Sequence, residues 1–89
     1  MSVVKKIFEV NNKAGEIYVE KCLDILDRIH YLMEKQGLST AQLAEKMLKT
    51  EDQVYDWTHG LQDFELSTIA AFEGALGEEI ITINEKEKI

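Results

Sequence analysis

The chain has no proline and only five glycines among its 89 residues. Both residue types interrupt helices, so their scarcity favours an almost wholly helical protein with short connections. Its single cysteine, Cys22, excludes an internal disulfide and is typical of a reducing cytoplasm. Because this cysteine lies at helical spacing from Ile25 and Ile29, we expect a small core residue there and not a reactive thiol.

Long apolar runs and catalytic groupings are missing as well. No apolar stretch of 18 residues occurs, and the first ten residues lack the apolar run of a signal peptide, so we expect a soluble cytoplasmic protein that binds no membrane. His30 and His59 stand 29 residues apart without a cysteine pair, and no nucleophile motif or glycine-rich phosphate loop occurs. We predict no cofactor, no metal site and no enzymatic activity.

Basic residues are scarce in one part of the chain only. Ten lysines and arginines against 17 acidic residues give a formal net charge of −7. Residues 1–36 hold six basic and six acidic residues, whereas residues 37–89 hold four basic and eleven acidic ones. A nucleic-acid-binding surface is usually basic, so the sign of this charge opposes DNA binding by the second part of the chain.

The hydrophobic content of 45% without low-complexity tracts indicates one small folded domain. Apolar residues recur at spacings of three and four over residues 16–36, which predicts an amphipathic helix that Gly37 ends. Residues 3–10 are apolar, but the pattern is too brief to decide between a short strand and a helical turn. Residues 11–15 hold two asparagines and a glycine, which indicate a break or turn after the N-terminal segment.

Residues 38–60 hold the most informative pattern, which predicts two short helices at about 40–48 and 51–59. The end signals are Ser39 or Thr40 for the first cap, Thr50 for the second cap and Gly60 for the final stop. The residues expected to face inward are Leu43, Ala44, Met47, Val54 and Trp57. Such short helices need each other and a third helix to bury their apolar faces. This arrangement is the helix-turn-helix, whose second helix can enter a DNA major groove.

A further helix is expected at about 66–76, with Asp63 or Glu65 near its start. Its expected buried stripe consists of Leu66, Ile69, Ala70, Phe72 and Leu76. The β-branched residues at 79–83 predict one short strand, which must pair with residues 3–8 or with the same strand of a second subunit. The predicted domains are an N-terminal extension (1–15), a helix-turn-helix domain (16–77) and a C-terminal strand and tail (78–89).

The two-helix pattern resembles the helix-turn-helix of the Xre-type family, which includes Cro-like and phage-repressor-like regulators. The residues that carry the resemblance are Leu38-Ser39, Leu43 to Met47, Thr50 to Val54, and Gly60. Residues 63–77 are similar to the fourth helix of that family, most of all in HigA-like antitoxins. The resemblance covers roughly residues 22–81. It implies an all-α, lambda-repressor-like DNA-binding domain of four or five helices, followed here by the short C-terminal strand.

The resemblance also implies where double-stranded DNA would lie. Carried over position by position, the residues that would contact DNA are Thr40, Thr50, Glu51, Asp52, Gln53 and Asp56. Lys49 is added as a basic residue on which binding is expected to depend. Thr40 is the phosphate position, and Gln53 can bond adenine through its amide. The three acids can only accept hydrogen bonds, which limits them to a cytosine amino group, and each repels the duplex.

Two features depart from the family pattern. Leu48 stands where the family usually has glycine, so the turn must avoid the left-handed conformation or be strained in it. Met33 and Thr58 stand where the family often pairs an arginine with a glutamate, which is consistent with an apolar replacement of that link.

A homodimer is expected, because regulators of this type commonly read two half-sites as symmetric dimers. The apolar stripe of Tyr18, Val19 and Cys22 is expected in the core, or at a dimer surface if the fold leaves it bare. Trp57 is expected to fill the core, with an exposed partner-binding role as the alternative.

Two functions fit these observations. The first is a DNA-binding transcriptional regulator of the Xre helix-turn-helix type, which could be antitoxin-like. The alternative is a protein-interaction module that keeps the helix-turn-helix scaffold but has little or no DNA binding because its recognition helix is acidic. Such a module would bind a toxin or another basic protein through that acidic face. The sequence names neither an operator nor a partner.

Overall fold

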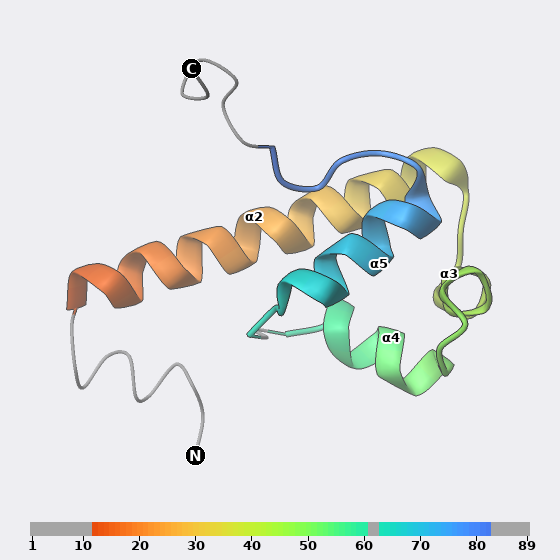
Figure 1. Cartoon of the computed structure of the whole chain (residues 1–89), viewed down its shortest axis with the longest axis horizontal. Helices are drawn as coiled ribbons and strands as arrows, with labels where there is room; N and C mark the ends of the chain where they lie inside the picture. Colours follow the sequence, from red (N-terminus) through yellow and green to blue (C-terminus); the bar gives the residue numbers. More distant parts are fainter. Residues whose placement is uncertain (1–11, 61–62, 83–89) are drawn as a thin grey trace.

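The computed structural model describes residues 12–60 and 63–82. Within these ranges the fold consists of helices without any strand, which confirms the all-α fold class. The described helices are α2 (Asn12–Gln36), α3 (Thr40–Met47), α4 (Glu51–Thr58) and α5 (Leu66–Leu76) (Figure 1). None of them combines the length and the apolar content that a membrane-spanning helix needs.

Helix α2 is longer than its apolar pattern predicts. It begins at Asn12, so the expected break at residues 11–15 is wrong for the part that the structure describes, and the helix crosses the predicted boundary after residue 15. A glycine inside a helix costs only about 1 kcal/mol relative to alanine, so one at position 15 does not stop the helix. At the other end Gly37 adopts a φ of +68°, and the Leu38 amide donates to the Met33 carbonyl oxygen at 2.9 Å, as in many helix C-termini.

Helices α3 and α4 each begin with a capping box. Ser39, and not Thr40, caps α3, because its hydroxyl accepts from the Gln42 amide while the Gln42 side chain accepts from the Ser39 amide. Thr50 and Gln53 form the same reciprocal pair at the start of α4. These caps satisfy amide groups that would otherwise lack partners, which fixes where each helix starts.

One buried cluster joins all four described helices. Its buried members are Ile29, Leu32, Met33, Leu43, Ala44, Met47, Val54, Phe72 and Leu76. The predicted burial of the inward residues of α3 is confirmed. On α4 Val54 is fully buried, whereas Trp57 is only partly buried and packs edge-to-face against Phe72 with ring centroids 5.9 Å apart.

The buried stripe of α5 is narrower than expected. Ile69, Phe72 and Leu76 are buried, but Leu66 is 72% exposed and Ala70 is exposed as well. The three buried residues follow the i, i+3, i+7 spacing of one helix face, and the two exposed residues lie about 100° around the helix from that face. The prediction that Leu66 and Ala70 are buried is therefore wrong.

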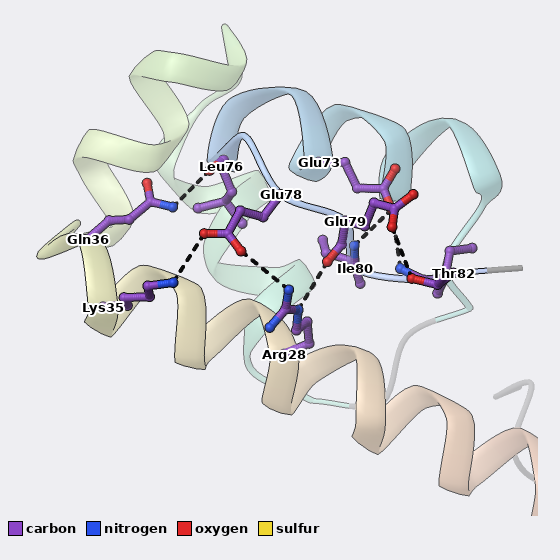
Figure 2. A network of polar contacts seen from close by, with 10 residues as sticks. Arg28, Lys35, Gln36, Glu73, Leu76, Glu78, Glu79, Ile80 and Thr82 are labelled. Atoms are coloured by element: carbon purple, nitrogen blue, oxygen red, sulfur yellow. Dashed lines mark hydrogen bonds and ion pairs between the residues drawn. The ribbon is translucent and has the colours of Figure 1, made fainter. Parts of the chain in front are cut away.

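The predicted strand at 79–83 is not confirmed. Residues 79–82 form no strand, with bends at Ile80 and Ile81, and Ile83 and residues 3–8 lie outside the described residues. The amides of Ile80 and Ile81 donate to the carboxylate of Glu73 on α5, at 2.8 and 3.2 Å (Figure 2). The amides of two consecutive residues thus point at one carboxylate oxygen, whereas in a strand they would point to opposite sides. The segment therefore lies against α5 and α2 without strand geometry.

Three side chains of α2 hold the C-terminal segment from the other side (Figure 2). The Arg28 guanidinium donates to the Glu79 carbonyl oxygen at 3.0 Å and lies 3.5 Å from one Glu78 oxygen. Lys35 lies 3.3 Å from the other oxygen of the same carboxylate. The Gln36 amide donates to the Leu76 carbonyl oxygen at 2.8 Å, which satisfies one free acceptor at the end of α5.

Helices α2 and α4 are joined beside Met33 and Thr58. Met33 and Thr58 are both buried, as an apolar replacement requires. The Thr58 hydroxyl donates to the Val54 carbonyl oxygen at 2.9 Å within α4. The Thr58 carbonyl oxygen lies 2.7 Å from His30 Nε2, and this hydrogen bond links the end of α4 to α2.

Candidate nucleic-acid interface

Helix α4 has two faces of different chemistry. Its inner face places Val54 and Thr58 in the core, and both are nearly inaccessible. Its outer face exposes Glu51, Asp52, Gln53, Tyr55 and Asp56. Because the inner face fixes the helix against α3 and α2, the outer side chains project from a rigid base into open solvent. Every residue predicted to contact bases lies on this exposed side or at its start.

The two residues best suited to hold DNA are already engaged with each other. The Thr50 hydroxyl accepts from the Gln53 amide at 3.1 Å and lies 3.2 Å from Gln53 Oε1. The same oxygen accepts from the Thr50 amide at 3.1 Å. Gln53 therefore has only its side-chain NH₂ free, and bidentate bonding to adenine requires this cap to open. The sequence pattern predicted Gln53 as a base reader and did not reveal its capping role.

The outer carboxylates carry unneutralised charge. Within residues 12–60 and 63–82, the ion pairs are those of Glu78 with Arg28 and Lys35, so none involves Glu51, Asp52 or Asp56. Glu51 and Asp52 lie in the first turn of α4, where an acid interacts favourably with the helix dipole. These two acids stabilise the helix, but the same charges repel a phosphate backbone.

The other two predicted contact residues, Thr40 and Lys49, flank this face. Thr40 is the first residue of α3 and is half-buried, and Lys49 is exposed in the turn before α4. Lys49 lines a hollow of about 380 Å³ between the two helices, together with Gln42, Glu45 and Glu51. It also lines a second hollow of about 290 Å³ beside Trp57. Lys49 is thus a basic residue set among carboxylates.

The turn between α3 and α4 is strained at Leu48. This residue has φ 58° and ψ 42°, so of the two expected alternatives it adopts the strained left-handed conformation, and its side chain is 90% exposed. Left-handed geometry costs a non-glycine residue roughly 1–2 kcal/mol. In return, the Leu48 and Lys49 amides donate to Glu45 and Ala44 carbonyl oxygens at 3.2 and 3.0 Å, which closes the end of α3.

The end of α4 holds an aromatic group that the sequence pattern did not single out. The His59 ring stacks on Tyr55 with centroids 3.8 Å apart, and its Nδ1 lies 3.0 Å from the Tyr55 carbonyl oxygen. The His30 ring lies edge-on to His59 at 5.7 Å, although the two are far apart in sequence. The sequence did hold one signal for this group, since Tyr55 is an aromatic residue on the polar face of a short helix.

These two histidines do not belong to a larger ligand set. Among the described residues, no group of three or more histidine, cysteine or acidic side chains is placed to hold a metal ion. Comparison of the chain with known proteins found no matching family model, no matching curated protein and no matching solved structure.

Proposed function

We propose that this chain is a DNA-binding transcriptional regulator of the helix-turn-helix type, acting in the cytoplasm as a homodimer and without enzymatic activity. The observation that carries this proposal is the presentation of α4. Two capped helices of eight residues each are joined by a short turn, and the second is fixed by Val54 and Thr58 while its outer face is exposed. A rigid exposed helix of this kind fits a DNA major groove.

The contacts follow from the chemistry of this face. Lys49 and Thr40 would donate to phosphate oxygens, and the exposed amide groups at the start of α4 would add backbone donors. Gln53 would bond a base edge through its free NH₂. Since Glu51, Asp52 and Asp56 repel the duplex, non-specific affinity is expected to be weak at physiological salt.

Selection from a pool of random DNA duplexes tests this proposal. The expected result is enrichment of a two-half-site sequence, with an affinity that falls as salt rises because the phosphate contacts release counterions. Lys49→Gln should weaken binding to all sequences alike, whereas Gln53→Ala should relax the preference at one base position. Lys35→Gln, on the far side of the core, is the matched control. Failure to enrich any sequence at low salt would overturn the proposal.

A second function is favoured by one specific observation: the carboxylates of α4 have no ion-pair partner among the residues that the structure describes. A face with three free acids and an aromatic ring, Tyr55, is also suited to a basic protein such as a toxin. Neutralising Glu51, Asp52 and Asp56 should have opposite effects in the two cases. It should strengthen binding to DNA and weaken binding to a basic protein, so one variant measured with both ligands separates the two functions.

A further inference from the structure

The N-terminal half of α2 and the C-terminal segment form a second open surface, away from α4. Figure 1 shows this half of α2 extending beyond the three shorter helices. A hollow of about 250 Å³ lies where the segment crosses α2. The residues that line it are Lys21, Asp24, Ile25, Ile80, Ile81 and Thr82.

The hollow mixes charged and apolar side chains, and two exposed isoleucines lie at it or beside it. Ile81 is 39% exposed at the hollow, and Ile17 is 42% exposed one helical turn before Lys21. Ile17, Lys21 and Asp24 are spaced by four and three residues, so they share one face of α2. An exposed apolar group on a projecting helix leaves surface in water that a partner could cover.

The charges on this face are self-complementary. Lys21 and Asp24 are three residues apart and exposed, and neither takes part in an ion pair within the described residues. When two α2 helices lie antiparallel about a two-fold axis between these positions, Lys21 faces Asp24 of the partner subunit. The same operation places Asp24 opposite Lys21 of the partner subunit, so one charge pattern forms two equivalent ion pairs.

The alternative dimer through paired C-terminal strands has less support. Glu73 already accepts from the amides of Ile80 and Ile81, so an incoming strand would first have to displace that carboxylate. The side chains of these isoleucines remain partly exposed. They can therefore contribute apolar contact to a helix-based interface while their amides stay bonded within the chain.

We propose that this face is the interface of a homodimer in which the two α2 helices pair antiparallel around Lys21 and Asp24. The projecting half of each α2 covers the hollow of the other copy, with Ile17 and Ile81 at the contact. The inference rests on one part of the proposed function, the homodimer, for which it supplies the interface. It does not depend on DNA binding. Its failure is therefore distinguishable from a failure to bind DNA.

Charge reversal tests this interface on the protein alone. The full chain should sediment as a dimer at micromolar concentration, and Lys21→Glu and Asp24→Lys should each weaken the dimer about tenfold or more because each places like charges opposite each other. Glu34→Lys, an exposed reversal on another face of α2, is the matched control and should leave the dimer unchanged. Circular dichroism checks that every variant keeps its helix content.

Mixing the two variants gives the sharpest result. Lys21→Glu carries two acids on this face and Asp24→Lys carries two lysines, so a one-to-one mixture should form a heterodimer that neither variant forms with itself. The double variant, Lys21→Glu with Asp24→Lys, should dimerise as the natural chain does. Three results would each overturn the inference: a natural chain that stays monomeric at millimolar concentration, single variants that dimerise undiminished, or a mixture that forms no heterodimer.

Discussion

The two faces of α4 differ in burial and in how their polar groups are paired. On the inner face Val54 and Thr58 are sealed against α2 and α3, and every polar group there has a partner. On the outer face three carboxylates, a glutamine and a tyrosine are exposed, and the acids have no ion-pair partner among the described residues. The inner face determines the fold, and the outer face is left to determine what the helix binds.

Stability and binding thus depend on different side chains of one eight-residue helix. Substitutions on the inner face should change the free energy of unfolding and affect ligands only through it. Substitutions on the outer face should change binding and leave the free energy of unfolding within about 0.5 kcal/mol, as is usual for exposed sites. Gln53 and Thr50 are the exception, because they serve the cap and the proposed DNA contact together.

The largest expected effect is on the inner face. Val54→Ala should lower the free energy of unfolding by about 2 kcal/mol, because it removes two buried methyl groups and leaves a cavity. Asp56→Asn, nearly isosteric and two residues away on the outer face, is the control and should change it by less than about 0.5 kcal/mol. Urea unfolding followed by circular dichroism measures both. Equal losses in the two variants would contradict the separation of the faces.

The cap should give the next largest effect. Thr50→Ala removes the hydroxyl that accepts from the Gln53 amide, and this should cost about 1 kcal/mol of stability. Thr50→Ser keeps the hydroxyl and should retain most of that stability. The same urea experiment measures the change. If alanine and serine were equivalent at this position, the capping box would contribute nothing to α4.

The strained turn should respond in the opposite direction. Leu48→Gly removes a left-handed leucine whose side chain is almost fully exposed, so it should raise the free energy of unfolding by about 1 kcal/mol or slightly less. Leu48→Ala keeps a Cβ atom and with it the strain, so it is the matched control. A glycine variant less stable than the alanine variant would show that the leucine side chain stabilises the turn.

The smallest effect is expected at alkaline pH, far from α4. Burial, and then a hydrogen bond with Cys22, raises the pKa of Tyr18 from 10.0 to about 12. The folded protein then holds this proton at pH values where the unfolded chain has lost it. The stability from the neutral phenol is therefore complete below pH 10 and lost as the pH rises towards 12. Tyr18→Phe should remove the part of the alkaline decline in thermal stability that Tyr18 causes. A variant with the same dependence of thermal stability on pH as the natural chain would contradict this role of Tyr18.

The sequence predicted the local features of this fold well. Caps and apolar spacing are local signals, so the bounds of α3, α4 and α5 and the burial of Leu43 and Val54 followed from the sequence. The strain at Leu48 could also be anticipated from one sequence, because a leucine stands at a turn position where glycine is usual. The start of α2 was missed because two asparagines and a glycine only weaken a helix and do not end it.

The remaining features depend on contacts between distant residues. The bond from His30 to the Thr58 carbonyl oxygen spans 28 positions, and the one from Arg28 to the Glu79 carbonyl oxygen spans 51. Neither leaves a periodic trace in the sequence. The predicted strand at 79–83 rested on β-branched residues alone, and a single carboxylate, that of Glu73, takes the amides of Ile80 and Ile81 that such a strand would use.

The most direct test of the central claim is DNA affinity after the outer acids of α4 are neutralised. The claim is that this face is the DNA-reading surface and that its charge limits the affinity. Glu51→Gln, Asp52→Asn and Asp56→Asn together should raise affinity for a selected duplex about tenfold or more at 0.1 M salt, since three like charges near the phosphates are removed. Loss of binding in this variant would contradict the account, because it would show that the acids read bases directly.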